Sequence, residues 1–584
     1  MFFSSFLCLI VMQGFSFTQS DISTDVFTFP KTILFSASPD QILNDAPKWK
    51  EQGVDVFFLD YVAREWSDNI WATDKKPWTI GKDDETFQKA YQANTLCKTL
   101  GMETYLKISF DHYLDWFNDI QWENVLHNFR QFGIFAKQTG CTGFAIDIEY
   151  IGEQYNFDWE GYKYDSYTRK DLVKKVRERS ADLINAVYSV FPDMVFLTFP
   201  EQGPNLGLII HLTWVEELAK KHATGGLHYC IEHTYRLKNP KEVLAYISGI
   251  DQIFLTYLSP QAKKYWKEKC SVAPGIWPFG FDYDSGHKPG YTVDELQEIY
   301  ALYIAASPKY NWIYSHNCYE QLLGRQSESF ESEEPLLKFL DVLKEKKKIS
   351  NLFLQDSIKL LRKRDFDALQ EKTGFALILF PADPNDNPRF QTVPIDKYEN
   401  QYDIFWKLGE KYLNGEEVDF QTIFHPIMKW KVAGPYHSGN FEETHNYKFA
   451  PETDLNFNDW KTLSLKPNKL SINFVDAFGP QEESCSYALC AFEVSQPTSA
   501  QIRFGFNDAV KLWLMKGSEC NLVYDYFGES SVVPDKVIIP VSFEHSVYKI
   551  LAKITNNKRF WGFTLRITDE KGNSIPDKFI KVLD

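Results

Sequence analysis

Apolar and polar positions alternate strictly over residues 143–150, GFAIDIEY. In an extended strand successive side chains point to opposite faces, so this pattern predicts one apolar face and one face that ends in two acids. The apolar face holds Phe144, Ile146 and Ile148, and the opposite face holds Ala145, Asp147 and Glu149. The second face has a small side chain at its start and two acids at its end. This indicates a strand that helices cover on the outer side and that opens into a cleft at its C-terminal end.

Strand-like and helix-like patterns alternate throughout residues 32–346. Strands are predicted at residues 32–38, 54–60, 102–110, 143–150, 194–199, 226–232, 271–277 and 311–316, with amphipathic helices between them. Such alternation predicts parallel strands joined by right-handed crossovers, and eight units are the number that closes a (β/α)8 barrel. A doubly wound open sheet is the alternative, but no G-x-G-x-x-G follows the first strand, which weakens its dinucleotide-binding version.

The pattern changes twice after the eighth unit. Residues 347–425 combine helical segments (357–369 and 402–413) with a short apolar run (375–380). From residue 426 helical periodicity fades, and short strands are predicted at residues 429–432, 486–492, 500–506, 510–515, 537–540, 548–554 and 560–567. The expected organisation is a (β/α)8 barrel over residues 27–346, a connecting α/β region over 347–425 and an all-β sandwich over 426–584.

The first residues of the chain have the composition of a targeting segment. Residues 1–17 are mostly apolar and are followed by the polar sequence TQSDIST, which predicts a signal peptide over residues 1–20 and a secreted or periplasmic protein. No other stretch has 18 consecutive apolar residues, so no membrane span is expected in the mature chain. In an oxidising compartment Cys485 and Cys490 could pair, although their spacing does not prove a disulfide.

Composition narrows the classes of partner. The formal charge of −16 argues against nucleic acid and anionic membranes as partners. The aromatic content of 16% is high. It is explained by large hydrophobic cores, and also by ring faces on which the apolar faces of pyranose sugars stack. The cysteines have no CxxC or other zinc-type spacing, so neither a metal nor another cofactor is expected.

Acidic and aromatic residues are concentrated where the predicted strands end, which is where the active site of a (β/α)8 barrel lies. These residues are Asp60, Asp111, Asp147, Glu149, Glu201, Glu232, His233, Trp277, Tyr314 and His316. The alternation also turns Lys107, Asp111 and Glu232 toward the barrel axis. Burial of this much negative charge is costly without a function, although Lys107 offsets part of it.

Two carboxylates that face each other across a cleft are the groups that glycoside hydrolysis requires. One must be protonated to donate to the leaving oxygen and the other ionised, and crowding of like charges separates their pKa values. We predict Glu149 as the general acid/base, Asp147 as the residue that orients or tunes it, and Glu232 as the second carboxylate. The residues predicted to bind a carbohydrate substrate are Asp60, Asp111, His233, Trp277, Tyr314 and His316. Glu201 is expected to be a binding or structural group.

Residues 143–150 resemble the fourth-strand signature of chitinase-type glycoside hydrolases, DGFDIDWEY. The matching residues are Gly143, Phe144, Ile146, Asp147, Glu149 and Tyr150. The resemblance implies that Asp147 orients and that Glu149 donates the proton. Thr142 and Ala145 stand in place of two aspartates and Ile148 in place of Trp, so the resemblance does not carry substrate-assisted N-acetyl chemistry to this chain. The order of acids also resembles retaining barrels with a nucleophile on strand four and an acid on strand six, which pairs Glu149 or Asp147 with Glu232.

The predicted sandwich resembles the jelly-roll accessory domains of polysaccharide-degrading enzymes. The similar segments are residues 430–436 (WKVAGPY), 506–508 (FND), 511–514 (KLWL) and 563–566 (FTLR). The resemblance implies an accessory, carbohydrate-binding type of domain.

Two other functions remain open at this stage. The first is a non-catalytic carbohydrate-binding or cell-surface protein that keeps the cleft without the chemistry. The second is a barrel metallohydrolase in which His228, Glu232 and His233 hold a metal together with Asp111 or His112. No P-loop, G-x-S-x-G or H-E-x-x-H sequence is present.

Overall fold

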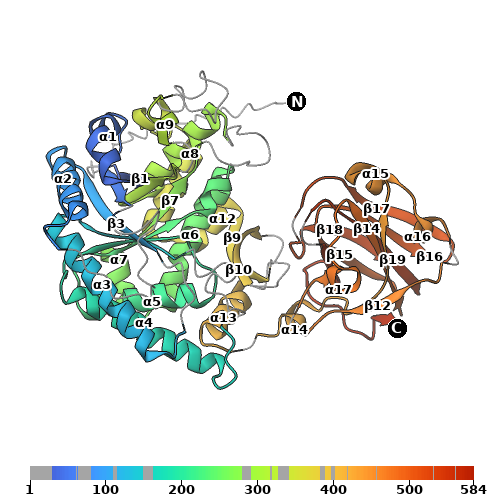
Figure 1. Ribbon diagram of the computed structural model, residues 1–584. Coiled ribbons are helices and arrows are strands. Elements are labelled where there is room, and N and C mark those ends of the chain that lie inside the picture. Colours follow the sequence, from blue (N-terminus) through green and yellow to red (C-terminus); the bar gives the residue numbers. More distant parts are fainter. Residues whose placement is uncertain are drawn as a thin grey trace, which may run out of the picture.

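The computed structural model describes residues 29–60, 62, 81–109, 115–148, 162–278, 291–315, 319–325, 341–346, 348–381, 388–395, 402–416, 418–454, 457–467, 469–530, 532–558 and 561–583. Within this part of the chain, a barrel, a connecting region and two antiparallel sheets follow one another (Figure 1). The predicted signal peptide, residues 1–20, lies outside the described residues. Among the helices that are described, none combines the length and apolarity needed to cross a membrane.

Eight parallel strands close into a barrel, as the sequence predicts. The strands are β1 (Lys31–Ala37), β2 (Val56–Leu59), β3 (Glu103–Ser109), β4 (Gly143–Asp147), β5 (Val195–Phe199), β6 (Leu227–Ile231), β7 (Ser271–Ile276) and β8 (Tyr310–Ile313). Pairing of Thr32 on β1 with Asn311 on β8 closes the cylinder. The open doubly wound sheet is therefore wrong.

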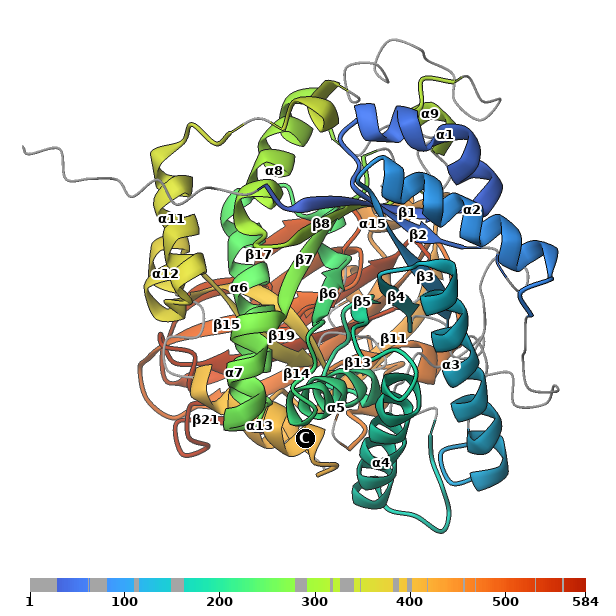
Figure 2. The ribbon, with the colours of Figure 1, turned by 90° about the vertical axis from the view of Figure 1, so that its left-hand side faces the viewer.

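Helices connect successive strands and surround the barrel (Figures 1 and 2). They are α1 (Pro39–Glu51), α2 (Glu85–Thr99), α3 (Asp119–Thr139), α4 (Arg169–Tyr188), α5 (Leu206–Lys220), α6 (Pro240–Tyr257), α7 (Pro260–Lys269) and α8 (Val293–Ala306). Reciprocal capping boxes at Ser38, Thr168 and Thr292 begin α1, α4 and α8. Helix α5 begins at Leu206, because Asn205 caps it by accepting a hydrogen bond from the Leu208 amide.

The alternation along the strands separates an outer core from an inner one. On β4, Phe144, Ile146 and Ile148 pack outward among the helices, whereas Ala145 belongs to the inner cluster and Asp147 faces Lys107. Strand β6 divides in the same way, with Leu227, Tyr229 and Ile231 outside and Cys230 inside. The alternation predicted for residues 143–150 is therefore confirmed over Phe144–Ile148, and β6 follows the same pattern.

The connecting region packs on the barrel beside α6. Its elements are α11 (Leu352–Lys363), α12 (Phe366–Thr373), the hairpin of β9 (Phe375–Pro381) and β10 (Pro388–Pro394), α13 (Tyr402–Leu413) and α14 (Phe420–Phe424). The helical segment predicted over residues 357–369 is divided between α11 and α12. Arg364 adopts a left-handed φ of 56° that ends α11, and Asp365 then caps α12.

The C-terminal region is a two-sheet antiparallel sandwich, as predicted (Figure 1). The larger sheet holds β12 (Lys461–Ser464), β11 (Lys429–His437), β14 (Ser484–Val494), β19 (Ser546–Asn556), β16 (Ala509–Lys516) and β17 (Glu519–Tyr526), with β21 (Ile580–Leu583) beside β14. The smaller sheet holds β13 (Ile472–Asn473), β20 (Gly562–Thr568), β15 (Thr498–Phe506) and β18 (Val537–Phe543). Cys485 and Cys490 carry free, buried thiols and belong to clusters on opposite faces of β14, so they do not form the disulfide considered from the sequence.

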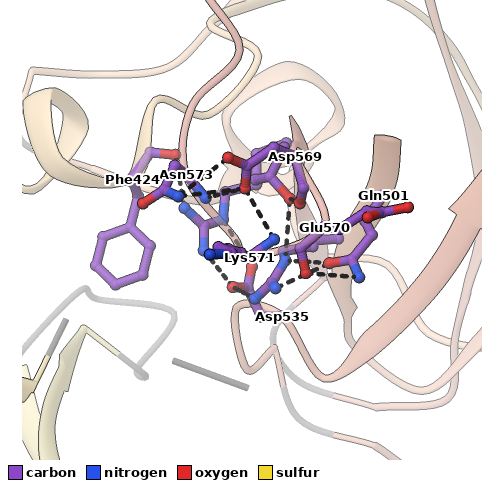
Figure 3. Close-up of polar contacts among 10 residues, drawn as sticks. Phe424, Gln501, Asp535, Asp569, Glu570, Lys571 and Asn573 are labelled. Carbon is purple, nitrogen blue, oxygen red and sulfur yellow. Dashed lines mark hydrogen bonds and ion pairs between the residues drawn. The ribbon is translucent and has the colours of Figure 1, made fainter. Parts of the chain in front are cut away.

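A buried ion cluster joins the smaller sheet to α14 (Figure 3). Asp535 Oδ2 accepts a hydrogen bond from Arg503 Nη1 at 3.1 Å, and Asp535 Oδ1 accepts one from Arg566 Nε at 2.9 Å. Arg566 also donates to the Phe424 carbonyl oxygen at 3.2 Å, and its guanidinium lies 5.1 Å from the centre of the Phe424 ring. The cluster therefore fixes the end of the connecting region on the sandwich.

Candidate functional site

The residues predicted to form the site fall into two groups. Asp60, Asp147, Glu232, His233, Trp277 and Tyr314 are described, and all six lie at or directly after the C-terminal ends of barrel strands. Asp111, Glu149 and His316 lie outside the described residues.

A lysine lies between two of the acids inside the barrel. Lys107 Nζ on β3 is 3.4 Å from Asp60 Oδ2, directly after β2, and 3.8 Å from Asp147 Oδ2 at the end of β4. The three side chains are 1%, 2% and 4% exposed, respectively. One ammonium thus compensates two carboxylates in a place where an isolated charge would be strongly disfavoured.

A bulge in the first strand supplies another contact to this cluster. The register between β1 and β2 shifts between Leu34 and Ala37, and Ser36 adopts a left-handed φ of 61°. Ser36 Oγ donates a hydrogen bond to Asp60 Oδ2 at 2.8 Å, and the Asp60 amide donates to the Ala37 carbonyl at 3.0 Å. The bulge therefore positions the Asp60 carboxylate toward Lys107.

The second acidic group forms where β5 and β6 end. Glu201 accepts hydrogen bonds from the backbone amides of Glu232 at 2.5 Å and His233 at 2.7 Å, and from the Tyr246 hydroxyl at 2.9 Å. Burial raises the pKa of Glu201 above its ordinary value, although the two amides and the hydroxyl oppose the shift. Glu201 thus holds the turn that carries Glu232.

Aromatic rings surround the barrel mouth next to these acids. Tyr235 stacks on Tyr314 with ring centres 5.4 Å apart, and Tyr314 meets the Trp277 ring edge-on at 5.1 Å. Trp312 lies beneath them, 5.3 Å from Tyr235. Gly275 on β7 makes room for this packing, since a Cβ there would approach Trp312 and Tyr235 to 2.5 and 2.7 Å. These rings form one wall of the site.

Tyr235 is the residue of this wall that the sequence did not single out. It lies in the short 3-10 helix His233–Arg236, and its backbone carbonyl accepts a hydrogen bond from the Tyr291 hydroxyl at 2.9 Å. Its side chain is 6% exposed, yet its hydroxyl has no hydrogen-bond partner among the described residues. Burial, with Glu232 and Tyr314 nearby, raises the Tyr235 pKa well above its ordinary value, so the hydroxyl is a neutral donor.

The metal site considered from the sequence is not assembled in the described part of the barrel. His228 lies at the opposite end of β6 from Glu232, and its Nδ1 forms a hydrogen bond with Ser271 Oγ at 2.8 Å. His233 instead packs its ring against Tyr246, with ring centres 4.6 Å apart. Within the residues that are described, no three His, Cys, Asp or Glu side chains are grouped as metal ligands.

A second groove, here called the sandwich groove, lies on the larger sheet of the sandwich. The side chains of Leu489, Trp513 and Leu551 form a cluster separate from the sandwich core, because they point away from the smaller sheet. The groove has a volume of about 640 Å³ and is lined by these three residues together with Phe457, Trp460, Lys511 and Lys549. Residues of segment 446–454 line the groove as well, so this apolar sheet face is partly covered by the chain.

No family model matches the chain, and no curated protein has a similar sequence. Solved structures with a partial likeness include a glucosidase from Croceicoccus marinus, which is 9% identical, covers 90% of this chain and 96% of its own, and has a TM-score of 0.32. A chitinase from Bacteroides thetaiotaomicron is 10% identical over 55% of this chain and 96% of its own, with a TM-score of 0.31. A morphinone reductase is 11% identical over 49% of this chain and 83% of its own, with a TM-score of 0.29. Scores of this size do not discriminate between these enzyme classes.

Proposed function

We propose that this protein is a secreted glycoside hydrolase that cleaves O-glycosidic bonds of a poly- or oligosaccharide with two carboxylates. The observation that carries the proposal is the grouping of Asp60, Asp147, Glu201 and Glu232 at one end of a closed barrel, next to a wall of aromatic rings. Carboxylates supply the acid and the base of glycoside hydrolysis, and partly exposed rings supply stacking surfaces for sugars. Neither a metal nor another cofactor enters this mechanism.

We assign the general acid/base to Glu149 and the second carboxylate to Glu232. The inward position of Asp147 supports the first assignment, because a strand that continued for two more residues would turn Glu149 toward the same cleft. The hydrogen bonds from the Glu232 and His233 amides to Glu201 support the second, because they hold the turn that presents Glu232. Asp147, paired with Lys107, orients or tunes Glu149.

The remaining predicted residues bind the substrate in this proposal. Trp277 and Tyr314 offer ring faces to sugar rings, while Asp60 and His233 bind hydroxyl groups, as do Asp111 and His316. The hydroxyl of Tyr235, buried without a partner among the described residues, supplies a further donor. A buried polar group in a cleft is satisfied when a ligand brings its acceptor.

The sandwich is proposed to bind the same polysaccharide away from the barrel. Its groove combines the partly buried rings of Trp460 and Trp513 with the ammonium groups of Lys511 and Lys549, a lining suited to sugar faces and hydroxyls. Trp513→Ala should weaken retention of the protein on the insoluble polysaccharide while leaving hydrolysis of short soluble oligosaccharides unchanged. Unchanged retention by Trp513→Ala would remove the sandwich from the proposal.

The proposed chemistry is tested by a polysaccharide and oligosaccharide digestion screen, followed by substitution of the acids. Glu149→Gln and Glu232→Gln should each lower hydrolysis at least about a hundredfold, the typical contribution of a positioned acid or base. Glu123→Gln, at an exposed acid of α3, is the matched control and should keep full activity. Full hydrolysis by Glu149→Gln would reject its assignment. Glycan binding without turnover by the wild type would favour the non-catalytic alternative, and activity abolished by chelation and restored by a metal would favour the metallohydrolase.

A further inference from the structure

A pocket at the other end of the barrel has no part in the proposed hydrolysis. This pocket, here called the rim pocket, lies where β7 and β8 begin and where α7, α8 and α11 end. Its volume is about 370 Å³, within the size range of small-molecule sites. Residues of four segments that are distant in the sequence line it, including Asp251, Glu268, Ser307, Lys309, Arg362 and Arg364.

The positive charges of the rim pocket exceed the negative ones that remain unpaired. Asp251 already binds Arg364, whose Nε donates to Asp251 Oδ2 at 2.7 Å, while Trp266 Nε1 donates to Asp251 Oδ1 at 2.6 Å. Among the other described residues that line the pocket, Lys267, Lys309 and Arg362 are cations, and Glu268 is an acid that pairs with Lys264 at 4.0 Å. This local excess of positive charge occurs in a chain with a formal charge of −16.

Lys309 is the least exposed of these three cations. It is half-buried, and its Nζ donates to the Lys269 carbonyl oxygen at 2.7 Å. Among the described residues it forms no ion pair, and burial lowers its pKa below the ordinary value, with Lys269 acting in the same direction. An ammonium that is partly removed from water without a carboxylate gains stability when an anion binds beside it.

Ser307 provides an independent indication of a ligand. Its side chain lines the rim pocket at the C-terminal cap of α8 and is 3% exposed. Its hydroxyl has no hydrogen-bond partner within the part of the chain that the structure describes. Buried hydroxyl groups usually have a partner, and a ligand oxygen in the pocket would supply one for this hydroxyl.

We propose that the rim pocket binds an oxyanion of the phosphate or sulfate type, either free or carried on a small molecule. Lys309 and Arg362 would compensate its charge, and Ser307 would donate a hydrogen bond to one of its oxygens. The site is separate from the acids of the barrel mouth, because it adjoins the N-terminal ends of the strands. The inference is therefore independent of the proposed glycoside hydrolysis.

The experiment measures binding of inorganic phosphate, inorganic sulfate and a hexose phosphate to the full chain by calorimetry and thermal unfolding. Ionic strength is held constant with chloride, since screening alone changes the strength of charge interactions. We expect saturable binding that raises the unfolding temperature, as any ligand of the folded state does. Tighter binding of the hexose phosphate than of inorganic phosphate assigns the pocket to a phosphorylated molecule, and equal or weaker binding assigns it to the free anion.

Three variants locate the binding site. Lys309→Met and Arg362→Gln should each weaken anion binding about tenfold or more, the loss of one charge-assisted contact. Lys98→Met, at an exposed lysine of α2 that does not line the pocket, should bind as the wild type does. Arg362 is exposed, so its variant tests the proposal even if Lys309→Met does not fold. Absence of saturable binding for all three anions, or binding that both pocket variants leave unchanged, would overturn the inference.

Discussion

Lys107 Nζ lies 3.8 Å from Asp147 Oδ2, so the acid that ends β4 faces a buried ammonium on the neighbouring strand. Asp60 lies on the other side of the same ammonium, at 3.4 Å. Three charged side chains at most 4% exposed form a unit in which each member depends on the others. This unit holds the inward-facing end of β4. Glu149 follows this strand in the sequence.

Lys107→Met should destabilise the protein strongly. The substitution leaves two buried carboxylates without their ammonium, and loss of one partner of a buried ion pair costs about 3–5 kcal/mol in the free energy of unfolding. Urea unfolding monitored by fluorescence measures this difference. Lys264→Met, at a lysine whose side chain is 78% exposed, should change the stability by less than about 0.5 kcal/mol. Equal stabilities of Lys107→Met and the wild type would show that the unit contributes nothing to folding.

Glu201→Gln should weaken the turn that carries Glu232. An amide group offers one acceptor oxygen where the carboxylate offers two, so one of the Glu232 and His233 amides loses its partner, at a cost of about 1–3 kcal/mol. The pKa of Glu201 is raised in the folded state, so its proton stabilises the fold below the ordinary value of 4.5 and this contribution is lost as pH rises through the raised value. The stability difference between wild type and variant should therefore grow as the pH falls from 7 toward 4.5. A difference that shrinks over this range would contradict the raised pKa.

Asp535→Asn should destabilise the sandwich and its junction with α14. Burial alone would raise the pKa of Asp535, but Arg566 and Arg503 together lower it below its ordinary value. Its contribution to stability is therefore present above the ordinary value of 3.8 and is lost only as pH falls through the lowered one. Removing this charge deprives two buried guanidinium groups of the carboxylate that they share, which costs about 3–5 kcal/mol.

The measurement for Asp535→Asn is calorimetric unfolding at neutral pH. Asp476→Asn is a suitable control, because the Asp476 carboxylate pairs with Lys466 at the surface, where the lysine side chain is 62% exposed. Exposed pairs of this kind contribute at most about 1 kcal/mol. Similar losses from the two substitutions would show that the buried cluster has no special role.

His445 should make the sandwich sensitive to mild acid. Burial lowers the His445 pKa from 6.5 to about 4, so the imidazole is neutral at pH 7 and its Nε2 forms a hydrogen bond with Asp525 Oδ1 at 3.0 Å. Since the folded-state pKa is lowered, stability is fully present above pH 6.5 and is lost as pH falls through about 4. His445→Gln should flatten the decline of the unfolding temperature between pH 6.5 and 4.5. His437→Gln, at an exposed histidine of β11, should keep the decline of the wild type.

Periodicity predicts those parts of this molecule that repeat. Eight alternating units predicted the closed barrel, and the alternation on β4 predicted that Ala145 and Asp147 face its interior. It also identified Lys107 as the cation that offsets the acids, because a strand turns every second residue to the same face. These predictions depend on local spacing, which a single sequence carries.

Features that depend on contacts between distant residues were not predictable in the same way. Glu201 accepts hydrogen bonds from the amides of Glu232 and His233 because β5 and β6 are neighbours in the barrel. The sequence separation of these residues gives no sign of this contact. The bulge that aims Ser36 at Asp60 has no glycine to signal its left-handed φ. Tyr235 lies in a short 3-10 turn, whose sequence shows neither strand nor helix periodicity.

Tyr235→Phe should separate function from stability at the barrel mouth. The hydroxyl of Tyr235 is buried and has no partner among the described residues, so its removal should leave the free energy of unfolding within about 1 kcal/mol of the wild type or raise it. Tyr229→Phe is the matched control. The Tyr229 hydroxyl accepts a hydrogen bond from the Gln202 amide at 2.6 Å, and its loss should cost about 1–3 kcal/mol.

If the Tyr235 hydroxyl binds the substrate, hydrolysis by Tyr235→Phe should fall about tenfold or more, the effect of losing one hydrogen bond of about 1.4 kcal/mol. The two variants should thus lose different properties. Tyr235→Phe should lose activity at full stability, whereas Tyr229→Phe should lose stability first. Steady-state hydrolysis and urea unfolding of the two variants measure this. A Tyr235→Phe variant that keeps full activity would show that the unpartnered hydroxyl only fills space between the rings of Trp312 and Tyr314.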